Sequence, residues 1–558
     1  MTYLVELLAT ACNELFGITV EPELTRPDEQ FGDFSSNVAL QLAKQTKQPP
    51  RDIAEQIKSY LEANNDGSIA SVSVAGPGFL NLTLADKLLL NVLHEVQAKK
   101  TDFGKNQTLA GQTIVIETNN PNPFKDLHIG HAYNIIVANT IANILESAGA
   151  KVHRVSYHGD VGLHVGKSMW AILKHINNDP SQLAAVGQAE RAKFMSEMYR
   201  QGSAAYKDNQ QAQAEIEELT KQSFRLDDPI FTEVYETCNQ WSFEYFDTIF
   251  KQLQSTPVEK RYLERDADVL GKQLVLDHVP DVFTESDGAV IYEGEKDGLH
   301  TAVFITQRGT TLYAARDLAL AVQKDEDFKM DASIVITGNE QQAYFKVVYA
   351  ALGNFMPELA NKCFSLPHGI IKLTTGKMSS RTGDVINIEW LFDAVAAAQQ
   401  DKGYTGDSQA DSQFAAIAYL FLKARIGGDI VFDPAESVSL EGNTGPYLQY
   451  AHARARSILR KAEVQGASEV DELQPAERSL VRKLSEYADA VERSSHDRMP
   501  HYIATYLYEL CQTFNRFYEQ NRVIGDERQD FRLSLVAAYA QVLKNGLELL
   551  NIAAPEQM

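Results

Sequence analysis

The chain of 558 residues is poor in cysteine, with only four in its whole length. The four positions are Cys12, Cys238, Cys363 and Cys511. They lie far apart, and their spacing fits neither a metal-ligand set nor a disulfide framework. We therefore expect a cytoplasmic protein without structural zinc.

Long apolar runs are also missing, because no run reaches the roughly 18 residues that a membrane span needs. The first residues of the chain carry Glu6 and Glu14 among leucines, and no basic stretch precedes them. That pattern is typical of an amphipathic helix and not of a signal peptide. We therefore expect no association with a membrane.

Positive charge is scarce: 52 lysines and arginines oppose 75 acidic residues, for a formal net charge of −23. A general nucleic-acid binder has a basic footprint, so this balance argues against that class. The C-terminal part is the exception, since residues 451–461 form a dense basic helix and more arginines follow among aromatic residues. Most of the aromatic spacing fits a helix-bundle core, but the arginines favour a negatively charged partner.

Length and pattern divide the chain into three domains. Residues 1–110 combine helix patterns with alternating strands, which predicts an N-terminal α/β domain. Residues 111–435 alternate strands with helices, which predicts a Rossmann-like, doubly wound parallel sheet with an insertion at about 175–300. Residues 436–558 are helical, which predicts an all-α bundle. The predicted fold class is therefore α/β multidomain.

The central feature of the sequence is the segment 119–131, Asn-Asn-Pro-Asn-Pro-Phe-Lys-Asp-Leu-His-Ile-Gly-His. It follows a β-branched strand at 114–117 and precedes a long helical pattern that ends near Gly149. A strand, tight loop and helix in this order begin a nucleotide-binding unit, in which anions bind at the helix N-terminus. His128 and His131 share one face of the first turn. On its own, such a pair also fits a helix cap or a packing role.

A second polar loop, residues 374–384, follows the last predicted strand of the sheet. Gly376 and Gly383 flank its core, and the basic residues Lys377 and Arg381 stand at the two ends of that core. Glycines allow a loop to move, and basic residues attract an anion. We expect this loop to close on a phosphate.

The two loops together, His128-Ile-Gly-His131 and Lys377-Met-Ser-Ser380, resemble the signature pair of the class I aminoacyl-tRNA synthetases. The whole chain resembles the arginyl-tRNA synthetase family along nearly its full length. The further stretches that carry this resemblance are 32–39, 76–79, 117–131, 158–160, 313–317 and 441–452. The arginine-rich helical C-terminus resembles the anticodon-binding domain of that family.

The resemblance implies an arginine–tRNA ligase, which forms arginyl-adenylate from L-arginine and ATP, releases pyrophosphate, and transfers the arginyl group to the terminal 2′-hydroxyl of tRNA(Arg). It also implies Mg²⁺ beside the ATP, a monomer, and an N-terminal domain that touches the outer corner of the tRNA. Removing a fixed donor such as His131 or Lys377 should cost on the order of 10²–10³ in rate.

The resemblance assigns the site residues as follows. The catalytic residues would be His128, His131, Lys377 and Lys125. The ATP site would also include Gly130, Gly338, Met378, Ser379 and Ser380. Arginine would be bound by Glu117, Asn122, Tyr313, Asp317 and Gln341, whose carboxylates match the guanidinium fork. The tRNA would contact Tyr447, Tyr450, Arg454, Arg460, Arg498 and Arg516.

One departure from the family pattern concerns the catalytic lysine. Many arginyl enzymes lack the lysine of the second loop and carry a compensating lysine just ahead of the first histidine. This chain has both, Lys377 and Lys125, so either could hold the pyrophosphate.

Three other functions remain open from the residues. A class I synthetase for another amino acid would share both loops, although a cysteinyl enzyme would carry zinc-ligand cysteines. A small nucleotidyltransferase would share the His-Ile-Gly-His loop but has no use for the C-terminal bundle. A non-catalytic tRNA-binding paralogue would have no need of His128, His131 and Lys377.

Overall fold

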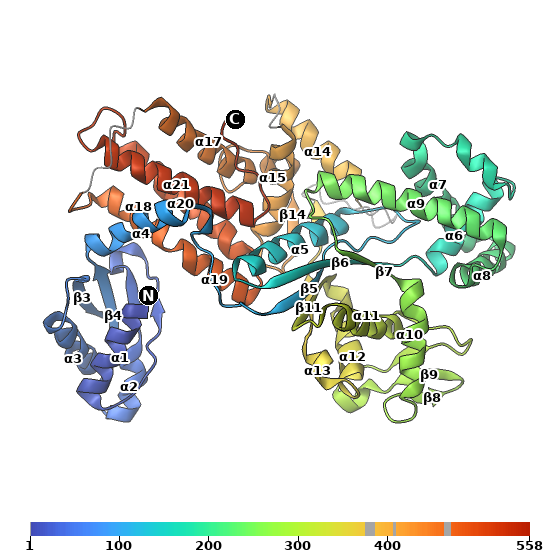
Figure 1. Ribbon diagram of the computed structural model, residues 1–558, viewed down its shortest axis with the longest axis horizontal. Coiled ribbons are helices and arrows are strands. Elements are labelled where there is room, and N and C mark those ends of the chain that lie inside the picture. Colours follow the sequence, from blue (N-terminus) through green and yellow to red (C-terminus); the bar gives the residue numbers. More distant parts are fainter. Residues whose placement is uncertain (1, 374–385, 405–408, 463–469) are drawn as a thin grey trace.

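The computed structural model of the chain describes residues 2–373, 386–404, 409–462 and 470–558. Three parts are visible in Figure 1: an N-terminal α/β domain, a central domain around a parallel sheet, and a bundle formed by the C-terminal helices. This arrangement confirms the predicted fold class.

The N-terminal domain is an antiparallel sheet of order β1-β2-β4-β3 packed against helices. The strands are β1 (Leu24–Thr25), β2 (Phe34–Ser36), β3 (Ile69–Ala75) and β4 (Phe79–Leu84). The helices are α1 (Thr2–Phe16), α2 (Val38–Thr46), α3 (Pro50–Ala63) and α4 (Asp86–Lys99), with a 3-10 turn at Glu29–Phe31. Apolar residues of α1 to α3 meet one face of the sheet, as the alternating pattern of its strands requires.

The central sheet has five parallel strands in the order β12-β11-β5-β6-β7. The strands are β5 (Thr113–Glu117), β6 (Lys151–His158), β7 (Lys260–Leu263), β11 (Ala332–Gly338) and β12 (Cys363–His368). In chain order the sheet grows from β5 to one side and then from β5 to the other. The strand order therefore reverses between β5 and β11, where open α/β sheets bind their ligands beyond the carboxyl ends of the strands.

Helices cover both faces of this sheet, and further helices and two small sheets lie around it. The crossover helices are α5 (Ile129–Ser147), α10 (Glu264–Asp277), α11 (Tyr313–Phe328), α12 (Gln342–Gly353) and α13 (Pro357–Asn361). A small antiparallel sheet contains β8 (Thr284–Ser286), β9 (Ala289–Tyr292) and β10 (Ala302–Ile305). Beyond the sheet lie β13 (Ile371–Leu373), α14 (Ile388–Asp401), α15 (Gln409–Leu422), β14 (Ile430–Phe432) and α16 (Pro434–Ser437).

The predicted insertion, at about 175–300, differs from the structure at both ends, because the inserted helices begin with α6 at Leu163 and end with α9 at Gln252. Four helices fill the gap between β6 and β7: α6 (Leu163–His175), α7 (Arg191–Asp208), α8 (Gln210–Arg225) and α9 (Pro229–Gln252). Strand β7, inside the predicted range of about 175–300, then pairs in parallel with β6 and belongs to the sheet itself. The sequence Lys-Arg-Tyr-Leu gives no clear strand signal, because a short strand at the edge of a sheet needs no apolar run.

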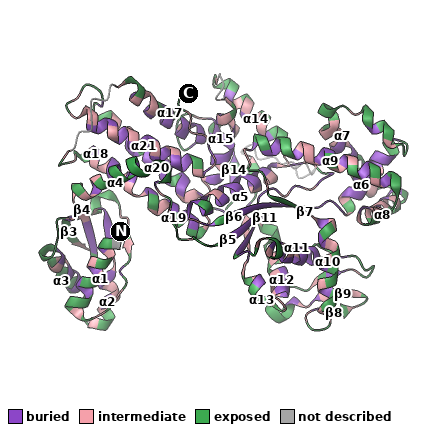
Figure 2. Ribbon diagram, in the orientation of Figure 1, coloured by how far each residue is buried: buried purple, intermediate pink, exposed green. Residues whose placement is uncertain are grey.

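The C-terminal bundle consists of long helices around an apolar core. They are α17 (Gly445–Lys461), α18 (Pro475–Ser485), α19 (Tyr487–Asp497), α20 (His501–Gln520) and α21 (Gln529–Leu549). Phe514 of α20 and Tyr539 of α21 stack with ring centroids 3.8 Å apart. Figure 2 shows that the buried residues lie in the central sheet and on the facing sides of α5, α20 and α21.

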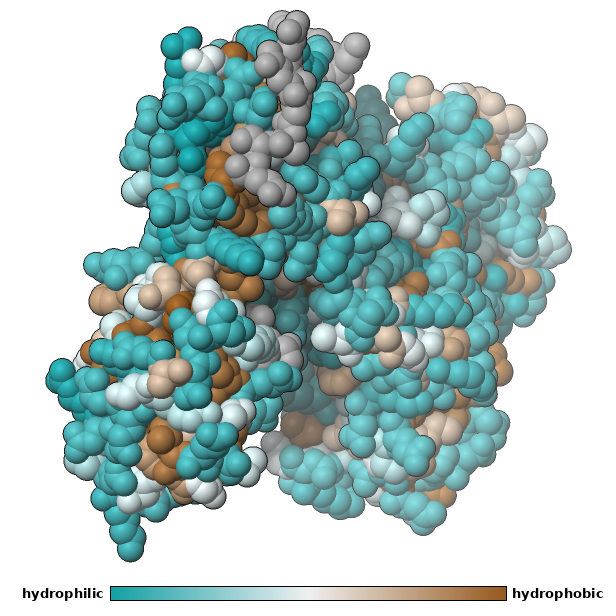
Figure 3. All heavy atoms as spheres, turned by 60° about the vertical axis from the view of Figure 1, so that its left-hand side comes forward, coloured by the Kyte–Doolittle hydropathy of each residue, from teal (hydrophilic) through white to brown (hydrophobic). Residues whose placement is uncertain are grey.

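The face of the molecule shown in Figure 3 is largely hydrophilic and is hollowed between the N-terminal domain and the central domain. Hydrophobic residues are visible there in small patches on the N-terminal domain. Within the described residues, no helix is both long and apolar enough to pass through a bilayer.

Candidate active site

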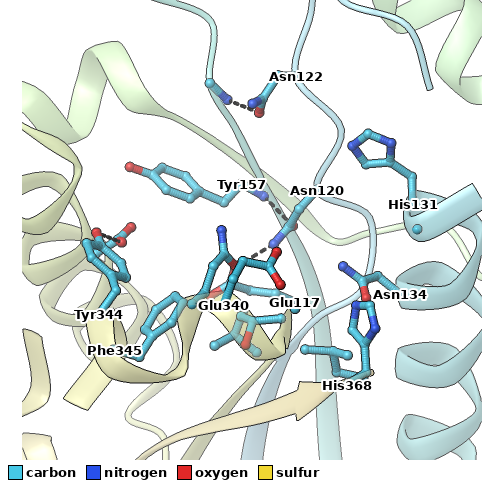
Figure 4. A pocket seen from close by; sticks show the side chains of 18 of the residues that line it. Glu117, Asn120, Asn122, His131, Asn134, Tyr157, Glu340, Tyr344, Phe345 and His368 are labelled. Atoms are coloured by element: carbon cyan, nitrogen blue, oxygen red, sulfur yellow. Dashed lines mark hydrogen bonds between the residues drawn. The ribbon is translucent and has the colours of Figure 1, made fainter. Parts of the chain in front are cut away.

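A pocket of about 870 Å³ opens at the carboxyl ends of β5 and β11, where the strand order reverses. Its volume lies within the range of small-molecule and cofactor sites. Its wall contains the end of β5, the first turn of α5, the inner face of α11, the turn after β11 and the end of β12. Figure 4 shows side chains from these elements converging on the pocket.

The loop after β5 is fixed by hydrogen bonds to the end of β6. The Asn120 side-chain oxygen accepts the backbone N–H of Tyr157 at 2.9 Å, and that of Asn122 accepts the N–H of Gly159 at 2.8 Å (Figure 4). A β-carbon on Gly159 would lie 3.0 Å from the Asn122 side chain, so glycine permits this close approach. The loop therefore has one defined shape beside the pocket.

His128 and His131 lie at the start of α5, with ring centroids 3.8 Å apart. The backbone N–H of His128 donates to His131 Nδ1 at 3.1 Å, so a neutral His131 carries its proton on Nε2. Burial, helped by the nearby Lys125 ammonium, lowers the pKa of His128 to about 4, and burial also lowers the pKa of His131. Both rings are therefore neutral hydrogen-bond donors near pH 7, above a helix N-terminus that favours anions.

Lys125 lies at the rim of the same pocket, exposed, and has no ion-pair partner in the described part of the chain. The residues predicted to cooperate with it, Lys377, Met378, Ser379 and Ser380, lie outside the described residues. The chain on both sides of that stretch lines the pocket, at Ile371 and Ile386. The backbone N–H of Ile129 donates to the carbonyl of Ile386 at 2.9 Å.

At the opposite end of the pocket, the two predicted carboxylates already have protein partners. Glu117 pairs with Lys324 at 2.7 Å through one oxygen and accepts from Asn120 at 2.7 Å through the other. Asp317 accepts a hydrogen bond from the Tyr344 hydroxyl. Burial raises the pKa of Asp317 to about 6. This end can bind a cation, but Lys324 offsets part of its negative charge.

The residues predicted to bind ATP and arginine lie together in this one pocket, as far as they belong to the described part of the chain. Those that line it are Lys125, His128, Gly130, His131, Glu117, Asn122, Tyr313, Asp317, Gly338 and Gln341. In Figure 4, His131 lies on one side of the pocket and Tyr344, the partner of Asp317, lies on the other, with Glu117 between them. The arrangement can hold an anionic and a cationic substrate next to each other.

Sequence reasoning missed many residues that line the pocket, and four of them are polar groups close to the predicted carboxylates. These four are Tyr157, Glu264, Lys324 and Tyr344. Two had a spacing signal: Lys324 stands two helical turns after Asp317, and Tyr344 stands one turn after Gln341. Glu264 follows the unrecognised strand β7, and burial raises its pKa to about 7, which the Arg316 guanidinium opposes. The Tyr157 hydroxyl has no hydrogen-bond partner within the described residues.

The residues predicted to contact tRNA lie in the C-terminal bundle, outside the pocket. Tyr450 is 41% exposed on α17, and the Arg454 guanidinium lies 4.8 Å from the ring centroid of Tyr518. The other four predicted residues have internal contacts: Tyr447 with Asn515, Arg460 with Glu556, Arg498 with Phe364 and Arg516 with Thr513. Of these, Arg498 faces the central sheet.

Several other arginines of the bundle are neutralised internally. The buried carboxylate of Glu477 pairs with Arg528 at 2.5 Å and with Arg532 at 2.9 Å. Asp33 of the N-terminal domain pairs with Arg478 at 2.7 Å. Part of the basic character that predicted a negatively charged partner therefore serves the fold.

Models of three protein families match the chain in sequence. The model for the catalytic domain of class I (R) tRNA synthetases matches residues 92–413. A model for the N-terminal domain of arginyl-tRNA synthetases matches residues 2–84, and one for the DALR anticodon-binding domain matches residues 448–558.

Similar proteins extend over the full length of the chain. An arginine–tRNA ligase of Flavobacterium psychrophilum is 29% identical over 99% of this chain and 98% of its own. One of Treponema denticola is 29% identical over 96% and 94%. Among solved structures, the arginyl-tRNA synthetase of Thermus thermophilus superposes with a TM-score of 0.82 at 26% identity, covering 100% of both chains.

Proposed function

The chain belongs to the arginyl-tRNA synthetase family of class I aminoacyl-tRNA synthetases, and we infer from this that it ligates L-arginine to tRNA(Arg). ATP is the co-substrate. The observation that carries the assignment to this pocket is the pairing of two neutral histidines at one end with two carboxylates at the other. The first set suits phosphates, and the second suits a guanidinium.

The reaction proceeds in two steps. The carboxylate of arginine attacks the α-phosphorus of ATP, a P–O bond forms to the carboxylate, and pyrophosphate leaves. A ribose hydroxyl of tRNA then attacks the carbonyl carbon of the adenylate, forms the ester, and releases AMP. As in class I enzymes generally, we assign the attack to the terminal 2′-hydroxyl.

In the first step, negative charge builds on the phosphate oxygens, so fixed donors and correct positioning supply most of the catalysis. We assign the donors to His128 and His131, supported by their neutral state and their place at the N-terminus of α5. Gly130 and Gly338 would let the nucleotide approach the backbone closely. Removing one donor should cost on the order of 10²–10³ in rate.

We assign the leaving pyrophosphate to Lys125 and Lys377 jointly. The unpaired ammonium of Lys125 at the pocket rim supports its part. Single and double alanine variants of the two lysines would separate their contributions. Met378, Ser379 and Ser380 remain proposed ATP contacts.

We propose that Mg²⁺ accompanies the ATP. The described residues contain no group of three His, Cys, Asp or Glu side chains that could hold a metal ion. No protein ligand is therefore assigned to the ion, which phosphate oxygens and water suit well.

For arginine, we assign the guanidinium to Asp317 and Glu117, with the Tyr313 hydroxyl beside them. The α-amino and carboxylate groups would lie at Asn122 and Gln341, nearer the histidines. All five line the pocket, which supports the assignment. The guanidinium would share Glu117 with the ammonium of Lys324.

We also propose the division into residues 1–110, 111–435 and 436–558, a monomeric enzyme and a cytoplasmic location. The ranges matched by the three family models support the division. In the bundle, Tyr450 and Arg454 would stack on anticodon bases and contact phosphates, together with Tyr447, Arg460, Arg498 and Arg516.

ATP–pyrophosphate exchange across all the amino acids, with and without tRNA, tests the proposed function. We expect exchange with arginine and none with lysine or citrulline, because only the guanidinium offers a planar fork of donors. Exchange driven by another amino acid would contradict the assignment of the substrate.

A further inference from the structure

The residue before Lys125 has an unusual backbone. Phe124 has φ of +61°, in the left-handed region that residues with a β-carbon seldom adopt. Such a conformation persists only where the surroundings impose it. The Phe124 ring is buried and stacks on Tyr235 of α9, with ring centroids 5.5 Å apart. The tip of the loop after β5, residues 124–126, is therefore packed into the core of the helical insertion, which consists of α6 to α9.

Three serines of the insertion hold this tip. Ser242 of α9 accepts the backbone N–H of Phe124 at 3.2 Å, and Ser168 of α6 donates to its carbonyl at 3.0 Å. Ser196 of α7 donates to the carboxylate of Asp126. The residues on both sides of Lys125 are thus fixed by hydroxyl groups from three different helices.

The helices that carry these serines form a tight frame. A β-carbon on Gly202 of α7 would lie 1.9 Å from the carbonyl oxygen of Lys167 in α6, so these two helices touch through their backbones. The hydroxyl of Tyr235 also donates to the Asp160 carboxylate, in the loop after β6, at 2.9 Å. One frame therefore holds the loops after both β5 and β6.

We propose that the helical insertion α6–α9 is a clamp that positions Lys125 toward the triphosphate of ATP, with Ser168, Ser196 and Ser242 as positioning residues. This proposal rests on the proposed function. Lys125 has no ion-pair partner among the described residues, so its own side chain is not held in place. Its direction depends on the main chain, which the serines fix.

Serine-to-alanine variants at 168, 196 and 242 test the clamp in ATP–pyrophosphate exchange. We expect each to raise the KM for ATP on the order of tenfold, because small displacements at a reacting site are costly. The KM for arginine should not change, since Asp317 lies at the other end of the pocket. Ser196 is only half-buried, so its variant leaves the core of the insertion intact.

A matched control is Ser494→Ala in the C-terminal bundle. Ser494 is also buried, and its hydroxyl donates to the carbonyl of Met499 at 2.9 Å. This variant should keep both KM values. Serine variants at 168, 196 and 242 that behave like the Ser494 variant would overturn the proposal.

Combining each serine variant with Lys125→Ala shows whether the clamp acts through the lysine. A positioning role predicts no further loss in the Lys125→Ala background, because interacting residues are non-additive. Additive losses would overturn the clamp, as would an unchanged KM for ATP in Lys125→Ala. Absence of arginine-dependent exchange in the unaltered chain would instead contradict the proposed function.

Discussion

The ion pair of Lys324 and Glu117 is a buried contact in the wall of the pocket. Both side chains are nearly inaccessible, at 6% and 5% exposure, and their charged atoms lie 2.7 Å apart. A buried charge that loses its partner is costly, although the intact pair adds little stability over an apolar one. The pair therefore fixes Glu117 and limits how much negative charge an incoming guanidinium meets.

Lys324→Met is the first prediction that follows from this pair. We expect the free energy of unfolding to fall by about 3–5 kcal/mol in a denaturant titration, because Glu117 is left charged and buried. The double variant Lys324→Met/Glu117→Gln should recover most of that loss. Arginine should raise the melting temperature more in Lys324→Met than in the unaltered chain, since the guanidinium can replace the ammonium.

Lys362→Met is the matched control for this prediction. Lys362 pairs with Asp325 at 3.1 Å on the surface, where both side chains are about one-third exposed. An exposed pair of this kind is worth less than about 1 kcal/mol. Equal losses from Lys324→Met and Lys362→Met would show that the pair at the pocket has no special cost.

The pH dependence of arginine use is the second prediction at the residue scale. Burial raises the pKa of Asp317 to about 6, and it raises the pKa of Glu264, a pocket carboxyl group that interacts with the charge of Asp317, to about 7. Below these values the carboxyl groups gain protons and lose the charge that attracts a guanidinium. We expect kcat/KM for arginine to fall as the pH drops from about 7 through 6.

The same experiment with ATP as the limiting substrate provides the contrast. His128, with a pKa of about 4, keeps the same charge across this window, and so does His131. The profile for ATP should therefore stay nearly flat between pH 7 and 6. Parallel profiles for both substrates would show that the carboxyl groups do not govern arginine binding.

At the scale of elements, the unit of β5, loop and α5 could be predicted because each part has a local signal. The strand is β-branched, asparagines and prolines break it, and the helix has a clear apolar period. Strand β7 could not be predicted, because an edge strand of four residues, Lys-Arg-Tyr-Leu, is too short to show a pattern of its own. Because β7 was not predicted, the place of Glu264 at its end, in the wall of the pocket, was not predicted either.

The site was only partly predictable for a similar reason. Asp317 and Lys324 share a face of α11, so spacing alone could have suggested the second from the first. The left-handed backbone of Phe124 had no such signal, because phenylalanine seldom adopts it and the cause lies in helices far along the chain. Contacts made only in three dimensions decide such features.

The third prediction concerns the packing of α6 on α7. Gly202→Ala places a methyl group where the Lys167 carbonyl lies, so the two helices must separate. Overpacking of this kind costs about 1–3 kcal/mol, and we expect that loss in a urea titration. Gly187→Ala is the control, because its φ of −60° suits alanine and no atom lies within 4 Å of the added carbon. Unchanged stability in Gly202→Ala would mean that the helices tolerate separation.

At the scale of the whole molecule, the N-terminal domain is tied to the C-terminal bundle (Figure 1). Asp33 is fully buried between them and binds Arg478 through both oxygens, at 3.2 and 2.7 Å. Arg482 lies 3.3 Å from the same carboxylate. A second pair, Arg26 with Asp489, spans the same interface at 3.0 Å. The two domains proposed to contact the tRNA are therefore connected by ion pairs, of which the Asp33 carboxylate is fully buried.

Asp33→Asn should loosen this connection. It removes the carboxylate that Arg478 and Arg482 share, while Asp86 and Glu486 still pair with them. We therefore expect a loss below the about 3–5 kcal/mol of a buried pair that is broken completely. Hydrogen exchange should then rise in β2 and α18, and the KM for tRNA should rise in aminoacylation because the two domains no longer hold one spacing. The pocket lies in another domain, so the KM values for ATP and arginine should stay unchanged. Glu29→Gln, which alters only an exposed contact with Ser479, should leave exchange and KM as they are. Unchanged protection in Asp33→Asn would mean that apolar contacts alone hold the domains together.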